Sequence, residues 1–474
     1  MSDAANVPKP WVLAAVCVGA ALPLAVTLWG FTVDDALVTA RVASRLAAGE
    51  GYRFNAGGQE VDAVTPLGFA HLLAAAGPAT PFGMLERARW VGLAAWLVAA
   101  ALLGCLLPRS RRALGAVVPV LALSAPLAGW ASSGMETAIV TLAATLALFG
   151  GAAGAAAAGF AAAWRPELLP FAVVLVGGGA LAAGEDLAGK GRKLALGLLL
   201  GLGPAVGVAT VRNLWFGAAA PLAVLAKPSD LSHGLAYAAA GFLFTGAPLL
   251  LLAPASLRAA PGPTRVLALA VVAHFLAVLA AGGDWMALFR LLVPVLPAAL
   301  LAGARLAELA PTRWLVARTV LAVAASVALL AWRGLPARTV LEHRRALIAR
   351  AEPLLRNAQS VAALDIGWVG AATNARILDL AGITDPLVAR LPGGHTTKRI
   401  SEGLIENRDV DTAILLLAPE HPVATPWNDS VFARQVENRL AQLAPIAEFR
   451  VVERLPLGGT RQSYVIVSRP TGRR

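Results

Sequence analysis

Residues 10–46 read PWVLAAVCVGAALPLAVTLWGFTVDDALVTARVASRL, and this stretch decides the class of fold. Its first part is an apolar run close to the length of about 20 residues that a helix needs to cross a bilayer. Its second part opens with two adjacent carboxylates, Asp34 and Asp35, and then mixes apolar and charged residues at helical spacing up to Ala48. We therefore expect a membrane-spanning helix followed by an amphipathic helix on the membrane surface.

Apolar runs of this kind continue along most of the chain. The 474 residues are 58% hydrophobic and only 14% charged, with a mean hydropathy of +0.68. These values exclude an ordinary soluble domain and indicate a mainly α-helical, polytopic membrane protein. We predict about eleven spans, near residues 11–29, 88–107, 113–130, 135–150, 152–165, 167–183, 193–211, 235–253, 265–281, 288–304 and 314–332. The Ala- and Gly-rich stretch 150–163 leaves open whether two of these spans form one broken helix.

The net charge of +12 is best explained by the orientation of these spans. Lys and Arg gather in short clusters between apolar runs, as the positive-inside rule predicts for cytoplasmic loops, so nucleic-acid binding is not expected. The N-terminus is then cytoplasmic, and the first loop, residues 30–87, lies on the outer face together with the C-terminus. The clusters expected on the cytoplasmic side contain Arg109, Arg111 and Arg112; Lys190, Arg192 and Lys193; Arg258 and Arg265; and Arg305 and Arg313.

The composition changes after Trp332, where long apolar runs end and charged residues become frequent. Short strand-like runs alternate there with helix-like runs. This pattern predicts a soluble α/β domain outside the membrane over residues 335–474, after a transmembrane domain over residues 1–334. The predicted strands are Val361–Leu364, Arg376–Leu380, Thr412–Leu417, Glu448–Arg454 and Ser463–Val467, and the predicted helices are Ala337–Leu355 and Asp429–Leu443.

The first outer loop carries motifs that resemble those of a known family. The sequence DDALVTARVASRLAAGEGYRFN, residues 34–55, is followed by QEVDAVTPLGF, residues 59–69. Together they resemble the first outer loop of the GT-C glycosyltransferases, and within them the branch that includes the terminal arabinofuranosyltransferases of mycobacterial cell walls. The matching residues are Asp34, Asp35, Arg41, Gly49, Gly51 and Asn55, while Asp62, Ala63 and Val64 replace the Glu, Gly and Tyr of that branch.

Further motifs similar to those of the family follow in the expected order. They are Ser133–Thr137, Arg165–Glu167, Arg212–Gly217 followed by Lys227, Gly282–Met286, Phe289–Arg290 and, in the tail, Asp365–Gly367 and Asp379–Gly382. The resemblance implies an enzyme of a bacterial-type inner membrane with its site on the outer face. It would move a sugar from a polyprenyl phosphate donor to an envelope glycan, lipid or protein.

This chemistry implies roles for the outer-face residues. An acceptor hydroxyl needs a base, and Asp34 or Asp35 would supply it, because one of two adjacent carboxylates in a partly desolvated site has a raised pKa. No cofactor is required, and a divalent cation at either aspartate is an open alternative. The cations selected to bind the leaving phosphate are Arg165, Arg212, Lys227 and Arg290. The residues selected to bind substrate are Arg41, Asp62, Glu136, Asp284 and Trp285.

Each selected residue also has a structural interpretation. The aspartates suit the first turn of a surface helix, basic side chains at a membrane surface bind lipid head groups, and acids in apolar segments form ion pairs. The six histidines lack the paired spacing of metal sites, so no metal site is predicted. Two other functions stay open, namely a transporter or flippase of lipid-linked sugars and a non-catalytic envelope scaffold.

Overall fold

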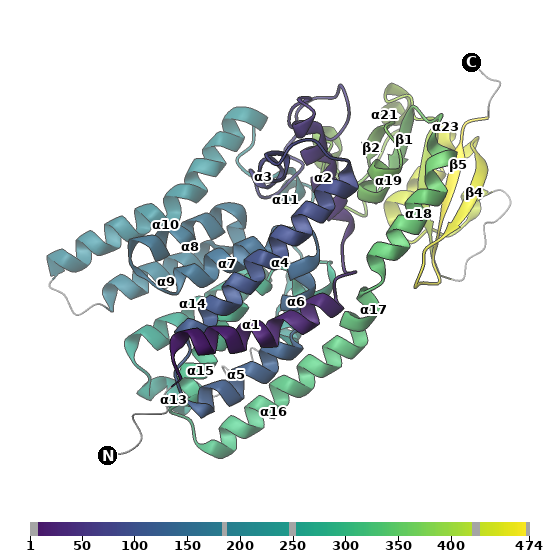
Figure 1. Ribbon diagram of the computed structural model, residues 1–474. Coiled ribbons are helices and arrows are strands. Elements are labelled where there is room, and N and C mark those ends of the chain that lie inside the picture. The colour runs from purple at the N-terminus through teal and green to yellow at the C-terminus, as the bar shows by residue number, and fades with distance from the viewer. Residues whose placement is uncertain (1–7, 183–186, 246–252, 420–426, 471–474) are drawn as a thin grey trace, which may run out of the picture. The chain divides into compact units, whose positions relative to one another are not determined.

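The computed structural model describes residues 8–182, 187–245, 253–419 and 427–470, and most of them are helical (Figure 1). The chain divides into two units. The helical unit comprises Met1–Thr32, Ala88–Val211 and Ser229–Arg338, and the α/β unit comprises Val33–Arg87, Arg212–Pro228 and Thr339–Arg474. The first loop therefore belongs to the same unit as the C-terminal domain. The sequence pattern had instead predicted that this loop is part of the transmembrane domain, residues 1–334.

The helical unit is built mainly from apolar helices that overlap the predicted spans. They are α1 (Pro10–Thr27), α4 (Pro81–Leu106), α5 (Arg111–Leu123), α6 (Ala125–Ser132), α7 (Thr137–Ala147), α8 (Gly151–Trp164), η2 (Pro166–Leu168), α9 (Leu169–Leu181), α10 (Leu187–Phe216), α12 (Leu231–Phe244), α13 (Ala253–Ala259), α14 (Gly262–Ala280), η4 (Ala287–Phe289), η5 (Val293–Val295), α15 (Leu296–Ala307), α16 (Thr312–Leu329), η6 (Leu330–Gly334) and α17 (Leu335–Ala337). Residue 183 of one predicted span and residues 246–252 of another lie outside the described residues.

Five described helical segments are long and apolar enough to cross a membrane, and the bent pair α5 and α6 would make a sixth. The five segments are Pro10–Thr27, Pro81–Leu106, Ala188–Phe216, Gly262–Ala280 and Thr312–Leu355. The predicted span 113–130 bends by 50° between α5 and α6, because Ser124 ends one helix and its side chain caps the next at the Leu127 amide. The other predicted spans correspond to shorter apolar helices.

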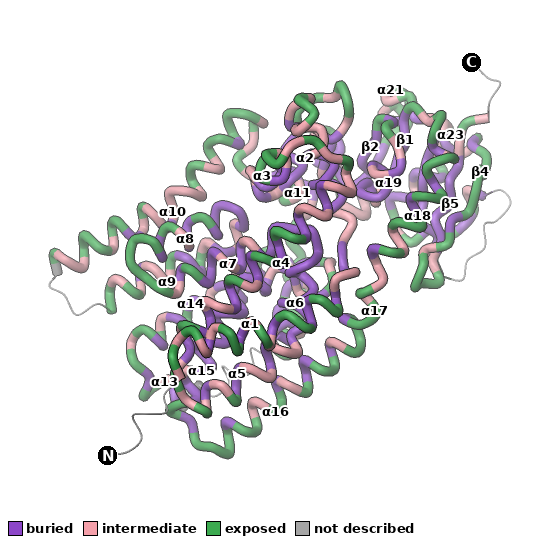
Figure 2. The backbone as a smooth tube through the Cα atoms, in the orientation of Figure 1, coloured by how far each residue is buried: buried purple, intermediate pink, exposed green. Residues whose placement is uncertain are grey.

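Large apolar side chains cover the outer surface of α10. Leu199, Val206 and Leu214 are 67%, 63% and 80% exposed, and Figure 2 shows exposed residues along most of this helix. Water-soluble proteins rarely leave so continuous an apolar surface uncovered, whereas a lipid bilayer accommodates it. The helical unit is therefore compatible with a membrane protein.

The α/β unit contains the amphipathic helix and the five strands that the sequence predicted. Its helices are α2 (Asp34–Ala47), α3 (Phe69–Ala74), α11 (Leu222–Leu225), α18 (Val340–Leu355), α19 (Ile366–Ala372), α20 (Pro386–Ala389), α21 (Glu402–Asn407), η7 (Trp427–Asp429), α22 (Gln435–Ala441) and α23 (Ala444–Ala447). Its strands are β1 (Ser360–Ala363), β2 (Arg376–Asp379), β3 (Thr412–Leu417), β4 (Arg450–Pro456) and β5 (Ser463–Ser468).

The strands form one mixed sheet in the order β2-β1-β3-β5-β4. Strand β1 is parallel to β2 and β3, and β5 is antiparallel to β3 and β4. Buried side chains such as Leu378, Leu415 and Val465 form its hydrophobic core. Because parallel strands end at the same edge of a sheet, Asp365 and Asp379 come at the carboxyl ends of neighbouring strands, the usual position of functional groups in α/β domains.

Candidate functional site

The residues selected from the sequence fall into two groups, one in each unit. The α/β unit contains Asp34, Asp35, Arg41, Asp62, Arg212 and Lys227, and the helical unit contains Glu136, Arg165, Asp284, Trp285 and Arg290.

Asp34 begins α2 and binds the first turn of α19. One carboxylate oxygen accepts a hydrogen bond from the Gly367 amide at 2.7 Å, and the other accepts one from the Trp368 amide at 2.9 Å. Free amides and the helix dipole at the start of α19 both favour a carboxylate there. Burial raises the pKa of Asp34 to about 6, against the opposing effects of Arg344 and the two amides. Asp34 thus stabilises the start of a helix that is 333 residues away in the sequence. Asp35 is the next residue and lies in the same first turn of α2.

Arg41 lies two turns further along α2 and binds the last turn of α19. Its side chain is 2% exposed. The guanidinium donates to the Gly370 carbonyl and to the Thr373 carbonyl at 2.8 Å, and also to the Phe54 carbonyl of the first loop at 2.9 Å. Helix α2 therefore places an acid at the amino end and a base at the carboxyl end of α19, as the helix dipole favours. These contacts orient Arg41 toward protein carbonyls.

Two glycines allow the close contact between α2 and α19. A Cβ atom at Gly367 would overlap the backbone oxygen of Asp34, and a Cβ atom at Gly370 would lie 2.9 Å from the Cδ atom of Arg41. The Asp365–Gly367 motif in the tail therefore has a packing explanation that depends on the first loop.

Substituting Gly367→Ala should separate α2 from α19. We expect a loss of about 1–3 kcal/mol in the free energy of local unfolding, because the added methyl meets backbone that cannot move alone. Amide hydrogen exchange of α2 and α19 in the full chain measures this loss. A Cβ atom at Gly403 in α21 meets nothing within 4 Å, so Gly403→Ala is a matched control that should leave this exchange unchanged. Unchanged protection in both variants would contradict the packing explanation.

Asp365 gathers three side chains that the sequence did not single out. Its carboxylate accepts from the Tyr464 hydroxyl at 2.6 Å and pairs with Arg434 at 2.8 Å. Burial by itself would raise the pKa of Asp365, but Arg434 and Arg344 and the two hydrogen bonds lower it below its ordinary value. These partners come from α18, β5 and the residue before α22, so no local pattern in the sequence points to them. The carboxyl groups of Asp365 and Asp34 therefore both lie at the start of α19.

Asp379 at the end of β2 is fully buried, and its surroundings predict a pH dependence for the stability of the α/β unit. Its carboxylate accepts from the Ala381 and Thr384 amides at 2.8 and 2.7 Å, and burial raises its pKa to about 6 despite these bonds. An acid with a raised pKa in the folded state binds more protons there than in the unfolded chain between about pH 4 and pH 6. Its contribution to stability is present in full below about pH 4 and is lost as the pH rises through about 6.

The α/β unit should therefore become more stable as the pH falls from 7 to 4.5. We expect Asp379 to contribute about 2 kcal/mol over this range, because one pKa unit corresponds to about 1.4 kcal/mol and the acid is not yet fully protonated in the unfolded chain at about pH 4.5. Hydrogen exchange of β1 and β2 at both pH values, in the wild type and in Asp379→Asn, checks this. The variant should show a flatter pH dependence, and an equal dependence in both proteins would contradict the assignment to Asp379.

Asp62 and Arg212 form an ion pair that is almost wholly buried. The Arg212 Nε atom lies 2.9 Å from Asp62 Oδ2, and both side chains are 2% exposed. Arg212 also donates to the Thr65 carbonyl, and nearby Trp215 donates to Glu60 at 2.8 Å. Residues 212–215 are thus bound to the part of the first loop that contains Glu60, Asp62 and Thr65.

Lys227 follows α11 and is partly exposed. Within the described residues, its ammonium group has no ion pair or hydrogen bond. Arg165, Arg212 and Arg290 each pair with an acid instead. Lys227 is therefore the selected cation that is most available to an external phosphate.

The helical unit brings together four selected residues in a second polar cluster. Arg165 at the end of α8 pairs with the fully buried Glu136 at the start of α7. Arg290 pairs with Asp284 at 2.8 Å. The ring nitrogens of His274 in α14 lie 3.1 Å from the Glu167 carbonyl oxygen and 2.7 Å from the Leu291 carbonyl oxygen, so the segments that carry the two ion pairs are neighbours. Each arginine is held by a carboxylate that a phosphate would have to displace or share.

The segment that carries Asp284 and Arg290 has a strained backbone. Gly282, Gly283, Leu288 and Phe289 all have positive φ, with 59° at Leu288 and 52° at Phe289. Such conformations are costly for residues with side chains and are concentrated at functional sites. The Trp130 indole donates to the Leu288 carbonyl at 3.1 Å and helps to hold this conformation.

Trp285 lies in the same segment and is exposed. The residue is 69% exposed, and its ring stacks on His233 with ring centroids 4.1 Å apart. It presents an accessible aromatic face of the kind on which a sugar ring or a lipid can pack. In the described ranges, no group of three or more His, Cys, Asp or Glu side chains is arranged to hold a metal ion.

Comparison with known proteins adds one match, which covers the C-terminal domain. A family model described as "Domain of unknown function (DUF8728)" matches residues 340–467. A search of curated proteins gave no match to the chain. The matched segment begins with α18 and ends one residue before the end of β5, so it covers nearly the whole sheet.

Proposed function

We propose that this protein is a membrane glycosyltransferase of the GT-C type. It moves a sugar from a polyprenyl phosphate to a hydroxyl group of an envelope glycan, lipid or protein. The motif resemblance, the exposed apolar helices and the ordered acids and cations support this proposal. Its single strongest support is the fixed position of Asp34, whose two oxygens are held by the Gly367 and Trp368 amides.

The proposed topology has about eleven spans in a bacterial-type inner membrane, in which the shorter apolar helices pack between the long ones. The N-terminus is cytoplasmic, and the first loop and the α/β unit are on the outer face. This orientation follows from the positions of the Lys and Arg clusters. Cysteine labelling of single-cysteine variants from either side of sealed vesicles measures it.

In the proposed reaction, Asp35 is the base and Asp34 is a positioning residue. The acceptor oxygen attacks the anomeric carbon as its proton passes to the Asp35 carboxylate. The bond from that carbon to the phosphate oxygen breaks, and polyprenyl phosphate leaves with the bonding electron pair. A single displacement of this kind inverts the anomeric centre. Asp34 suits base catalysis less well because both of its oxygens already accept hydrogen bonds.

Lys227 is the first proposed contact for the leaving phosphate, because its ammonium is available while the arginines are paired. Arg212, Arg165 and Arg290 are further proposed contacts, each with an acid that fixes its position. Arg41, Asp62, Glu136, Asp284 and Trp285 are proposed to shape the substrate site. The reaction as proposed needs no cofactor, and a divalent cation at the aspartates is tested by adding EDTA.

The decisive experiment uses the purified full chain in nanodiscs with a panel of polyprenyl-phosphate sugars. Release of polyprenyl phosphate is followed with and without envelope glycan, lipid and protein acceptors. Acceptor-dependent release from one donor is the expected result. Movement of a labelled donor across sealed vesicles without its consumption would instead identify a transporter. If neither is seen with any donor, the scaffold alternative would stand.

A further inference from the structure

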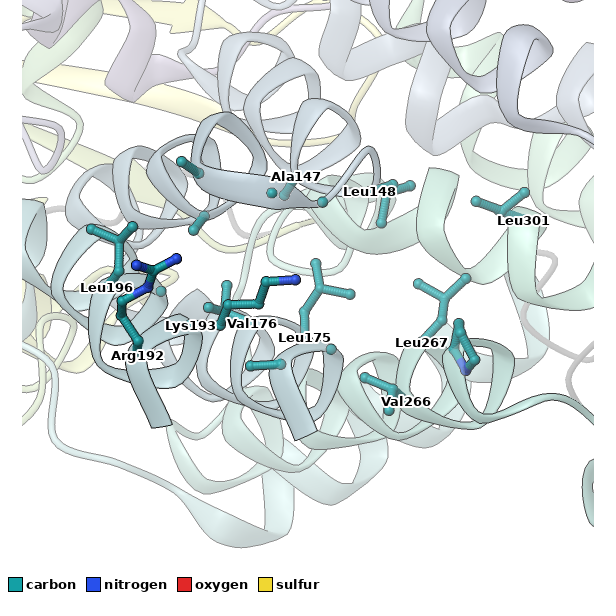
Figure 3. A pocket seen from close by; sticks show the side chains of 18 of the residues that line it. Ala147, Leu148, Leu175, Val176, Arg192, Lys193, Leu196, Val266, Leu267 and Leu301 are labelled. Carbon is teal, nitrogen blue, oxygen red and sulfur yellow. The ribbon is translucent and has the colours of Figure 1, made fainter. Parts of the chain in front are cut away.

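The helical unit contains a cavity that none of the candidate site residues lines. Its volume is about 490 Å³, which is within the range of about 300–1,000 Å³ that is usual for small-molecule sites. The walls come from the ends of α7, α8, α9, α10, α14 and α15 and are made largely of apolar and small residues. They include Leu148, Leu175, Val176, Leu196, Leu267 and Leu301, most of which Figure 3 shows around the opening.

The cavity combines this apolar wall with positive charge. Arg192 and Lys193 on α10 and Arg305 on α15 line it, and the described lining residues include no acid. In Figure 3, Arg192 and Lys193 lie on one side of the cavity and Leu267 and Leu301 on the other. A ligand that matches both features has an apolar chain and an anionic head group. A free phosphate would leave the apolar wall unfilled, and a neutral lipid would leave the cations unmatched.

The cavity is separate from the polar cluster of Glu136 and Arg165. That cluster is at the start of α7 and the end of α8, whereas the cavity is lined by Ala147 and by Gly151, at the opposite ends of the same two helices. Helices of 11 and 14 residues separate the two places by roughly 16–21 Å at 1.5 Å per residue. Within the helical unit, the cavity is therefore at the opposite ends of α7 and α8 from the Glu136–Arg165 pair.

We propose that this cavity binds one acyl chain of an anionic phospholipid, whose phosphate contacts Arg192, Lys193 and Arg305. Basic pockets between apolar helices bind anionic lipid head groups by charge. The apolar wall would hold the acyl chain by van der Waals packing, because a chain that comes from the bilayer gains little by transfer to another apolar environment. The site would hold a lipid from the surrounding bilayer and would act in stability or regulation. It does not depend on sugar transfer, so each proposal can fail without the other.

Native mass spectrometry of the detergent-purified full chain tests this site. Phosphatidylglycerol and phosphatidylcholine are titrated separately, and the first is expected to bind at least tenfold more tightly. The triple variant Arg192→Gln, Lys193→Gln, Arg305→Gln should lose at least tenfold in affinity for phosphatidylglycerol. A control triple variant of exposed arginines, Arg109→Gln, Arg111→Gln, Arg313→Gln, should retain it. Inorganic phosphate at millimolar concentration should not compete.

A cavity-filling variant tests the apolar wall independently. A Cβ atom at Gly179 in α9 meets nothing within 4 Å, and neither does one at Gly115 in α5, which is not part of the wall. Gly179→Leu should therefore weaken lipid binding at least tenfold, and Gly115→Leu should not. The proposal would be overturned if the wild type bound the two lipids equally. It would also be overturned if the triple variant of Arg192, Lys193 and Arg305 and the Gly179→Leu variant both bound phosphatidylglycerol as tightly as the wild type does. Competition by inorganic phosphate would overturn the role of the acyl chain.

Discussion

Replacing Asp35 by asparagine is expected to lower sugar transfer by about 10²–10⁴-fold, the usual effect of losing a general base. The amide cannot take the acceptor proton, while its size and hydrogen-bonding capacity stay close to those of the acid. The contact between α2 and α19 should persist, because Asp34 binds the α19 amides. The rate is measured as polyprenyl phosphate release, together with donor binding and hydrogen exchange of α2 and α19.

Asp34→Asn is the matched comparison. Each carboxylate oxygen of Asp34 accepts a hydrogen bond from one backbone amide. An asparagine side chain has only one acceptor oxygen, so its NH₂ group would face the N–H group of the other amide. We expect this variant to lose protection in α19 by about 1–3 kcal/mol, as for an unsatisfied buried polar group, with any loss of turnover following from it. An Asp34→Asn protein with intact protection and no turnover, beside an active Asp35→Asn protein, would assign the base to Asp34.

Arg212→Met is expected to cost about 3–5 kcal/mol, because it leaves the Asp62 carboxylate buried without its partner. Both side chains are 2% exposed in the pair, so solvent screens little of the loss. Burial already raises the pKa of Asp62, against the effect of Arg212. Hydrogen exchange of residues 59–69 in the full chain measures the change in local stability.

Two controls separate the buried charge from simple loss of packing. The double variant Asp62→Leu, Arg212→Met removes both charges and should be less destabilised than Arg212→Met alone. The pair Arg345–Glu86 is 54% and 33% exposed, and Arg345→Met should cost less than about 1 kcal/mol because water screens exposed pairs. Equal losses in the single and double variants at Arg212 would show that the pair carries no special energy.

Local patterns predicted most elements of the fold. The helical spacing after Asp34 predicted α2 almost to its last residue. In the described residues, the predicted apolar runs overlap helices, five of which are long and apolar enough to cross a membrane. The five strands lie within two residues of their predicted bounds. Short apolar runs bounded by turns are typical of buried strands, and β1, β3 and β5 are almost wholly buried. The 50° bend between α5 and α6 was missed, since Ser124 and Pro126 were read as part of one continuous apolar run.

The candidate site was predicted less completely, because most of its contacts join distant segments. The adjacent acids drew attention to Asp34, but its partners are 333 and 334 residues away. Nothing near Arg41 shows that it binds the carbonyls at the end of α19. Arg434 and Tyr464 have no motif around them, and only the packing of the sheet brings them to Asp365.

The sequence by itself determined that the chain is mainly apolar helices with a small α/β domain, since hydropathy and periodicity are properties of short segments. It also marked the acids and cations that carry the proposed chemistry. Only the tertiary structure decided that Asp34 and Arg41 bind the two ends of α19, and that Asp62 and Arg212 are buried as a pair. It also showed that Lys227 keeps an available charge among the described residues. The physical reason is that charges and hydrogen bonds act at a few ångströms through space, a distance that spacing along the chain does not encode.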